Sequence, residues 1–396
     1  MINAGSALCL KCGNILTEAY YFNSSSNAWV RLKKSGRKNF SVEEFIPSSK
    51  SRTGCTGFSL NKNHKADVSI MSDTIHVDFF EKGERAENKQ FHRCCPECNG
   101  SEVFSKFGLL PTYVIAVIGA RTVGKTSWIK ALSKINNQNK LLRRTYPYCI
   151  DSARWEIDFK LIKATDLNDM GSTNLLTISK RGTRHTTKKA VANVLMLDFA
   201  GELFASTDKI EDKQTRVEEY DRMCRLLRGT HDYNGADAVV FMDAPNSQFD
   251  PVVPYNSVKE LGVLEKKPVA YVVNKVDMMF DNPPKVSLPG SDAKTDLFTS
   301  DTFAHNADAD IYKKSEIVPR VMLETYLASK YNELAHRILT ENPHSAGFFI
   351  QTTDAVTDET SDDAPERHSD TGSDVSINVL DPIIWLLNEL DIFPIL

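Results

Sequence analysis

The residues with the clearest chemistry are 119–126, which read GARTVGKT. They match the pattern G-x-x-x-x-G-K-[S/T], in which inward-facing backbone amides and the start of a helix hold a polyphosphate. An apolar run, YVIAVI, leads into the motif, and an amphipathic run, SWIKALSKI, follows it. We therefore expect Lys125 to contact the β- and γ-phosphates and Thr126 to place its hydroxyl on Mg²⁺.

The predicted phosphate site takes in the whole loop and the residue after it. Glycines suit such a loop because they let the backbone approach the phosphates closely. Arg121 is a candidate transition-state arginine only by its place in the loop. The alternative is a glycine turn that joins a strand to a helix and binds nothing. The predicted nucleotide-binding residues here are Gly119, Ala120, Arg121, Thr122, Val123, Gly124, Lys125, Thr126 and Ser127.

A second motif, DFAGE at residues 198–202, follows the apolar run NVLML. An Asp at the end of a neighbouring strand can hold Mg²⁺ through water, so Asp198 is a predicted metal residue. The backbone N–H of Gly201 can bond to the γ-phosphate. Because that bond exists only while the γ-phosphate is present, residues 202–216 are a predicted switch segment. The alternative is a strand-ending Asp in an ordinary turn.

A third motif, NKVD at residues 274–277, follows the apolar run PVAYVV. The Asp277 carboxylate can accept hydrogen bonds from guanine N1–H and the 2-amino group, and adenine has no such donor pair. We expect Asn274 to tie this segment to the phosphate loop and the Lys275 stem to cover the base. The alternative is a helix cap or turn. All three motifs follow a predicted strand, and ligands of open α/β sheets bind at that edge.

Two C-x-x-C pairs, Cys9 with Cys12 and Cys95 with Cys98, predict a Cys₄ zinc site. Four protein ligands leave no open position, so this zinc would be structural. The long gap between the pairs predicts an inserted β module. Cys94 is an alternative to Cys95, and reduced unliganded cysteines or a redox pair are alternatives to zinc. The other cysteines, predicted to be plain thiols, are Cys55, Cys149 and Cys224.

The apolar runs predict how these motifs are positioned. Short runs that are apolar on both faces, as in a covered parallel sheet, occur at 113–118, 193–197, 236–242, 269–273 and 347–350. Helical patterns alternate with them, which predicts an α/β fold. One helix is expected on the stripe Met322, Tyr326, Leu327, Leu334 and Ile338. The last helix is expected to begin at Asp381, as its cap, and Pro382.

Composition indicates an ordinary globular chain, since 41% of the 396 residues are hydrophobic and 25% charged. We expect a β-rich zinc module at 1–105, with a strand at 74–80, and an α/β domain at 107–396. Insertions at 280–310 and 354–374 are predicted to be mobile and disordered, respectively. No leader or membrane span is recognised, which favours the cytoplasm. The net charge of −4 gives no reason to expect tight nucleic-acid binding by the whole chain.

GARTVGKT, DFAGE and NKVD resemble the first, third and fourth motifs of the translation-factor-like (TRAFAC) P-loop GTPases. This resemblance implies a Ras-like, doubly wound P-loop NTPase fold. Thr352 and Thr353 stand where the fifth, base-backing motif of that class usually reads Ser-Ala-Lys. By its distance before Asp198, Thr173 is the best candidate for the switch threonine that binds Mg²⁺. Its alternatives are Thr186 and Thr187.

The resemblance also implies how the chain acts. Glu202 stands where Ras-like members carry a water-positioning Gln, so we expect turnover to be slow or to depend on a partner. The C-x-x-C pairs, the DxAGE form and the final helix are similar to bacterial double-GTPase proteins of predicted defence gene clusters. A partner GTPase or another protein effector is then expected.

Three functions follow as hypotheses. The first is a Mg²⁺-dependent GTPase switch. The second is a GTP-binding adaptor that acts through its zinc module with little hydrolysis. The third, a P-loop kinase or ATPase, is disfavoured by NKVD.

A basic run is most simply a solvated face, and a nucleic-acid or partner patch is its alternative. That run comprises Arg31, Lys33, Lys34, Arg37 and Lys38.

Overall fold

The chain divides into two compact units in a computed structural model. The first unit is Met1–Tyr113 together with Asp221–Gly235, and the second is Val114–Tyr220 together with Ala236–Leu396. The sequence places the boundary near residue 106 and does not foresee that 221–235 joins the first unit. The structure describes residues 1–4, 6–25, 28–34, 40–44, 65–71, 74–81, 84–98, 110–120, 123–135, 155–160, 173–181, 188–204, 213–245, 247, 252–279, 285–287, 294–296, 341–352 and 379–392.

The second unit is built on a seven-stranded sheet. The neighbours β9, β13, β14 and β17 run parallel, whereas β10, β11 and β12 form antiparallel pairs. The predicted α/β class is therefore confirmed. In spatial order the strands are β10 (Trp155–Lys160), β11 (Thr173–Arg181), β12 (Lys188–Ala200), β9 (Thr112–Gly119), β13 (Ala238–Asp243), β14 (Val269–Val273) and β17 (Ser345–Phe349).

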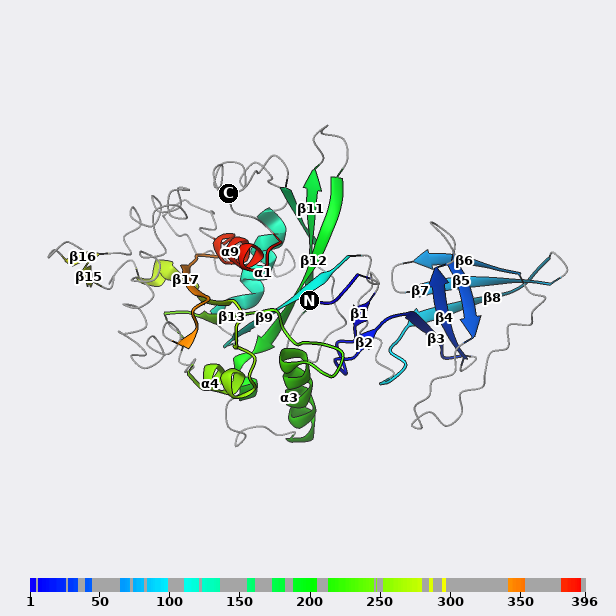
Figure 1. The fold of residues 1–396 in the computed structure, drawn as a ribbon, viewed down its shortest axis with the longest axis horizontal. Helices are drawn as coiled ribbons and strands as arrows, with labels where there is room; N and C mark the ends of the chain where they lie inside the picture. The colour runs from blue at the N-terminus through cyan, green and yellow to red at the C-terminus, as the bar shows by residue number, and fades with distance from the viewer. Residues whose placement is uncertain are drawn as a thin grey trace, which may run out of the picture. The chain divides into compact units, whose positions relative to one another are not determined.

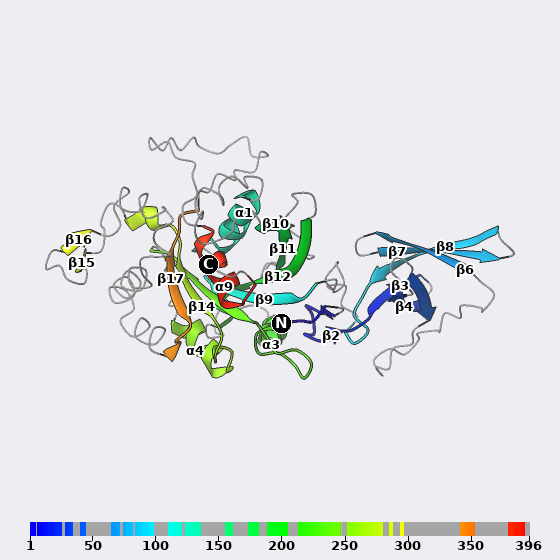
Figure 2. The same cartoon turned by 45° about the horizontal axis from the view of Figure 1, so that its top comes forward.

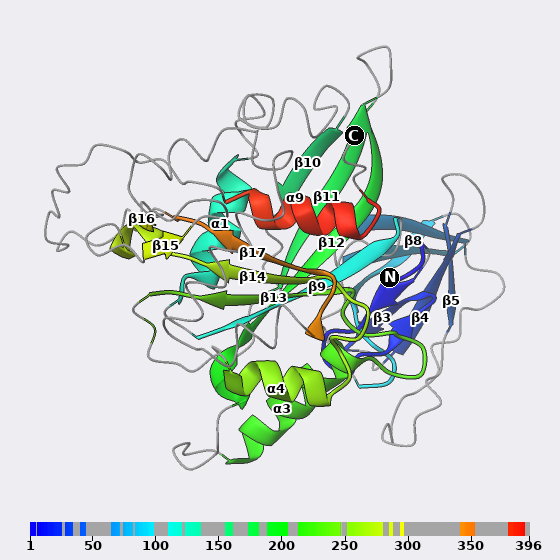
Figure 3. The same cartoon turned by 60° about the vertical axis from the view of Figure 1, so that its left-hand side comes forward.

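The parallel strands are apolar on both faces because helices cover both faces. Every residue of β13 and β14 is buried. Helices α1 (Lys125–Ile135) and α9 (Asp381–Glu389) lie on one face, and α4 (Val252–Glu260) lies on the other (Figures 1 and 3). On α1, Trp128 is fully buried, and its indole N–H donates to the carbonyl of Val379 at 2.8 Å.

The C-terminal helix α9 is present where the sequence predicts it, but it is capped differently. Ile384 and Leu387 are fully buried, and the Trp385 ring lies 5.7 Å from that of Phe348. The N-cap residue is Leu380, with helical backbone and no side-chain cap bond, so the expected cap by Asp381 is wrong. Pro382, in the first turn, has a fixed φ that suits a helix and has no N–H that needs a hydrogen-bond partner. The helix can therefore begin without a polar cap.

Two predicted segments between β14 and α9 fall largely outside the described residues. The helix expected on the Met322–Ile338 stripe and the acidic insertion at 354–374 lie wholly outside them. The insertion expected at 280–310 holds a short antiparallel pair, β15 (Lys285–Ser287) and β16 (Lys294–Asp296), which the sequence did not lead us to expect.

The first unit contains a small hairpin and a separate six-stranded antiparallel sheet, visible in Figure 2. The hairpin pairs β1 (Ala7–Leu8) with β2 (Ile15–Leu16). The sheet contains the strand predicted at 74–80. Its spatial order is β5 (Phe40–Glu44), β4 (Ala28–Lys34), β3 (Ala19–Asn23), β8 (Glu84–Arg93), β7 (Thr74–Glu81) and β6 (Lys65–Met71).

Helix α3 (Lys213–Arg228) carries residues of both units. Its residues 213–220 are assigned to the second unit and residues 221–228 to the first. Within the described part of the chain, none of the helices has the length and apolar character needed to cross a membrane.

The buried indole of Trp128 provides a test of this packing. Trp128→Phe removes the N–H that bonds to Val379 and leaves a cavity in the core, so it should lower the free energy of unfolding by about 2–3 kcal/mol. Urea unfolding followed by circular dichroism measures this. Trp385→Phe keeps an aromatic ring beside Phe348 at a partly exposed position and should cost less; an equal loss would contradict the assignment.

Candidate functional site

The end of β9 and the start of α1 form a tight loop that holds Lys125. The Lys125 ammonium donates to the carbonyls of Gly119 at 2.7 Å and Ala120 at 2.8 Å. It also lies 3.8 Å from a carboxylate oxygen of Asp198, and both side chains are buried. The loop therefore presents a fixed positive charge at the carboxyl end of β9, and removing either partner would leave a buried charge unpaired.

A hydroxyl and a carboxylate meet beside this ammonium. Thr126 donates from Oγ1 to Oδ2 of Asp198 at 3.3 Å. Thr126 is the second residue of α1, and Asp198 lies near the end of β12. Oxygen atoms of these two kinds are the ligands that Mg²⁺ prefers.

The start of β11 lies beside Asp198. Thr173 is the first residue of β11 and pairs with Leu197, directly before Asp198. The alternatives, Thr186 and Thr187, lie outside the described residues. The residue that follows them, Lys188, is ten positions from Asp198 on the same strand, or about 33 Å at the rise of a β-strand.

Asn274 is the residue that connects the loops. Its side chain is fully buried at the end of β14 and donates to the carbonyl of Val123 at 3.1 Å. It is also within 3.0 Å of the Thr352 hydroxyl, and its Oδ1 accepts from the Thr352 N–H at 3.2 Å and the Lys275 N–H at 2.8 Å. One amide thus connects the loop after β9, the NKVD segment and the segment after β17.

Gly124 is required by this junction. Its φ of +88° lies in the left-handed region, and a Cβ there would lie 2.4 Å from Nδ2 of Asn274. A side chain at this position would therefore both strain the backbone and displace the amide. Lys275 also has a positive φ, +59°, which is uncommon for a residue other than glycine.

Several predicted residues are located only by their backbone. Gly201 and Glu202 begin the 3₁₀ turn η3 (Gly201–Phe204), and Asp277 lies in η4 (Val276–Met279). These positions follow β12 and β14, at the same strand ends as Asp198 and Asn274, and the side chains of Glu202 and Asp277 are not described. Outside the described residues are Arg121, Thr122 and Thr353.

Asp243 is a site residue that the sequence analysis missed. It ends β13 with a buried side chain; its carbonyl accepts from the Asn274 N–H at 2.9 Å, and its carboxylate accepts from the Tyr271 hydroxyl at 3.4 Å. The available signal was an Asp at the end of the apolar run AVVFM, between the second and third motifs. Asp243 supports the loop from the strand between β9 and β14.

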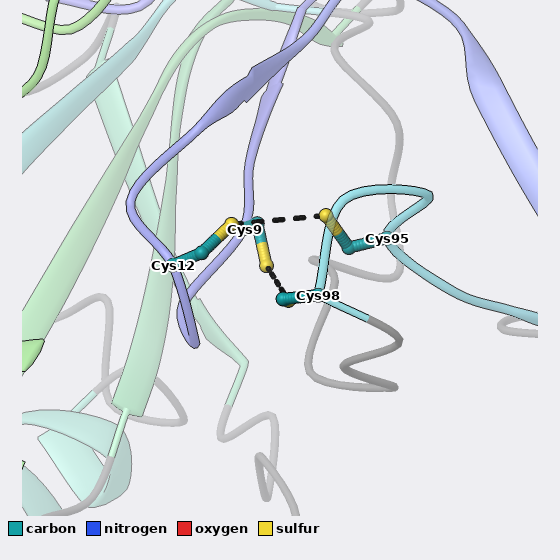
Figure 4. A group of neighbouring side chains, drawn as sticks. All are labelled: Cys9, Cys12, Cys95 and Cys98. Carbon is teal, nitrogen blue, oxygen red and sulfur yellow. Dashed lines mark hydrogen bonds between the residues drawn. The ribbon is translucent and has the colours of Figure 1, made fainter. Parts of the chain in front are cut away.

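The four predicted cysteines come together in the first unit (Figure 4). All four sulfurs lie within 4.8 Å of one another, with 3.6 Å between Cys9 and Cys98 and 3.8 Å between Cys12 and Cys95. Sulfurs around one zinc ion lie about 3.8 Å apart, given Zn–S bonds of about 2.3 Å. The group is therefore close enough to hold a metal ion and is compatible with zinc.

Local structure explains which cysteines are used. The β1–β2 hairpin bends between Cys9 and Asn14, where the Gly13 N–H donates to the Cys9 carbonyl at 2.8 Å. The second pair follows β8, so the six-stranded sheet fills the gap between the pairs. The group contains Cys95 and not its neighbour Cys94. Of the remaining cysteines, Cys224 lies in α3 outside the group, and Cys55 and Cys149 are not among the described residues.

Electrostatics favour a cation among these sulfurs. Hydrogen bonds to neighbouring thiols, together with burial, raise the pKa of Cys9. Hydrogen bonds from Cys12 and Cys9 lower the pKa of Cys95. The cluster thus cannot lose all its protons without a compensating charge, and a divalent metal supplies that charge as it displaces them.

At least one charge of the basic run in the first unit is already paired with an acidic side chain. Arg31, on β4, forms an ion pair with Glu18 at 3.1 Å. Lys33 and Lys34 are located by backbone only, and Arg37 and Lys38 lie outside the described residues. Nothing in the described part of the run adds to the case for nucleic-acid binding.

No protein-family model matches this chain, and no curated protein matches it either. The resemblance to the TRAFAC GTPases therefore stays a prediction drawn from three motifs. What the site can do is inferred from its own residues.

The cysteine cluster predicts the metal content of the purified protein. We expect one zinc per chain by inductively coupled plasma mass spectrometry. Cys95→Ser removes a ligand and should release the metal, whereas Cys94→Ser leaves the tetrahedron intact and should retain it. Loss of zinc from Cys94→Ser but not from Cys95→Ser would contradict the ligand set.

The Gly124 contact predicts a stability difference between two glycines. Gly124→Ala should cost more than about 2 kcal/mol because it strains φ and displaces the Asn274 amide. Gly262 has a similar φ, +70°, but nothing lies within 4 Å of its Cβ position. Gly262→Ala should therefore cost only about 1 kcal/mol of backbone strain. Chemical unfolding of both variants compares them, and equal costs would refute the contact.

Proposed function

We propose that the second unit binds a guanine nucleotide with Mg²⁺ and hydrolyses GTP. The observation that carries this proposal is the buried Asn274 junction. It joins the phosphate loop after β9, the NKVD segment after β14 and Thr352 after β17. These are the carboxyl ends of parallel strands, where open α/β sheets bind ligands.

The phosphate end of the nucleotide would lie on the loop that Lys125 holds. The ammonium, already oriented by two loop carbonyls, supplies positive charge to the β- and γ-phosphates. The amides at the start of α1 add the positive end of the helix dipole. Binding of a polyanion here is thus supported by both the charge and the backbone.

The metal would be held by the Thr126 hydroxyl and, through water, by Asp198. The hydrogen bond between Oγ1 of Thr126 and Oδ2 of Asp198 means that the two oxygens are neighbours. Thr173 is the favoured switch threonine, because its backbone pairs beside Asp198 whereas Lys188, next to the alternatives, lies at the far end of the strand. Mg²⁺ would neutralise phosphate charge as it develops in the transition state.

The base end is assigned to guanine by Asp277. This residue lies in the turn η4 after Asn274, whose amide anchors the segment. A carboxylate at this position pairs with guanine N1–H and the 2-amino group, and a base without those donors would leave it unsatisfied. The neighbouring Lys275 stem would cover the base.

Hydrolysis would proceed by in-line attack of water on the γ-phosphate. Gly201 and Glu202, in the turn after β12, follow Asp198 closely in sequence and would lie near the γ-phosphate. Because Glu202 is anionic, it is a weaker water-positioning group than Gln, so slow or partner-dependent turnover is expected. The order of the three motifs supports membership of the TRAFAC class. A role in bacterial defence rests only on the similarity to the double-GTPase proteins.

The first unit would contribute a structural zinc. Cys9, Cys12, Cys95 and Cys98 supply four sulfurs and leave no coordination position for a substrate. The metal would cross-link two segments that the six-stranded sheet separates in sequence.

Nucleotide binding tests the proposal directly. With magnesium, fluorescent GTP and GDP should bind and ATP should not compete. Lys125→Ala should weaken binding by at least about a hundredfold, because it removes a charge that contacts two phosphates. Asp277→Asn should shift preference from guanine to xanthine nucleotides, with Asp232→Asn, at an exposed site, as the matched control.

The outcomes separate binding from hydrolysis. Unaltered affinity in Lys125→Ala, or an unchanged base preference in Asp277→Asn, would refute the assigned site. Phosphate release in a single turnover then distinguishes a hydrolysing switch from an adaptor that only holds GTP.

A further inference from the structure

The first cysteine knuckle, residues Cys9–Gly13, accepts two hydrogen bonds from residues of the segment Asp221–Gly235. Arg222, which is buried on α3, donates from Nε to the carbonyl of Leu10 at 2.7 Å. Leu10 lies between the two cysteines of the knuckle. Thr230, just after α3, donates its hydroxyl to the carbonyl of Gly13 at 3.3 Å. All of these residues belong to the first unit.

Gly13 brings the knuckle against the same segment. Its φ of +76° lets the chain turn after Cys12. A Cβ at Gly13 would lie 3.3 Å from Cγ2 of Thr230 and 3.5 Å from Cβ of Arg225. The backbone of the knuckle thus lies close to the segment, with little room for a side chain between them.

Charge adds to this fit. A zinc ion with four thiolates carries a net charge of −2, because four negative sulfurs exceed the dication. Arg222 presents a buried guanidinium to the carbonyl beside Cys9, and hydrogen bonds from charged donors are stronger than neutral ones. The metal-bound form of the knuckle therefore suits this cation better than four neutral thiols do.

We propose that the first cysteine knuckle anchors the C-terminal half of α3, so that metal occupancy fixes residues 221–235. Helix α3 is continuous from Lys213, and its first residues belong to the predicted switch segment. The anchor thereby couples the metal to the nucleotide state, a consequence that rests on the proposed function. Coupling of this kind is reciprocal: if GTP and GDP change zinc affinity, zinc changes theirs by the same factor.

Hydrogen exchange of the full-length protein tests the anchor. After zinc is removed by a chelator, the rate of amide hydrogen exchange in 221–235 should rise by about tenfold or more. This is the rise expected when the stability contributed by one charge-assisted hydrogen bond is lost. Arg222→Met should show the same rise while it retains zinc. Arg228→Met removes a charge from an exposed position on the same helix and should match the wild type. Strands β13 and β14 provide the internal reference.

A second comparison isolates the Gly13 contact. Gly13→Ala should raise exchange in 221–235, whereas Gly262→Ala, which has a similar φ but no neighbour, should not. Unchanged exchange in 221–235 after chelation and in Arg222→Met would overturn the anchor.

The coupling has its own readout. The zinc affinity, measured by competition with a chromogenic chelator, should differ at least about threefold between protein loaded with a non-hydrolysable GTP analogue and protein loaded with GDP. Equal affinities would overturn the coupling. If neither nucleotide binds at all, the proposed function fails and the coupling fails with it, while the exchange measurements still decide the anchor.

Discussion

The second unit depends on one buried amide. A primary amide has two N–H donors and a carbonyl acceptor, and each must be satisfied when water is excluded. Asn274 meets this requirement by bonding to Val123 and Thr352, which lie in loops far from it in sequence. Because a buried unpaired polar group is costly, the bonds hold the three loops in one arrangement. Gly124 makes the approach possible.

The sheet determines which loops this amide can reach. β13 lies between β9 and β14, and β17 flanks β14, so three parallel strands bring the loop with Gly124 and Lys125, Asn274 and Thr352 to one edge. Asp243 at the end of β13 supports the middle of the row through the Asn274 backbone. The strands hold this edge because helices bury both of their faces, and the core thus fixes positions that the polar residues then use.

The sequence predicts the parts of this arrangement that are local. Apolar runs give the strands, because burial on both faces requires apolar residues at every position. The spacing of each C-x-x-C pair is likewise local, because one tight turn of four residues brings its two sulfurs together. The predicted cap of α9 is wrong. Asp381 is a residue type that often caps helices, but the helix already begins at Asp381, so Leu380 occupies the N-cap position.

Contacts between distant residues are what the sequence does not predict. Thr352 stands where the sequence predicts a base-backing motif, and no local pattern encodes its two hydrogen bonds to Asn274. Similarly, nothing in α3 itself indicates that Arg222 reaches a carbonyl in the N-terminal hairpin. The amphipathic pattern of a helix reports that one face is buried, but not against what.

The long gap between the cysteine pairs shows how such distant contacts persist. The entropy lost in closing a loop grows only with the logarithm of its length, so a large insertion adds little to the cost of bringing the pairs together. Here the insertion is also folded: β3 and β8 pair near their ends, with Tyr21 opposite Arg93. That pairing brings residues 21 and 93 together, so the effective loop between the cysteine pairs is short. A gap in sequence is therefore weak evidence against a metal site whenever the intervening chain forms a sheet whose ends meet.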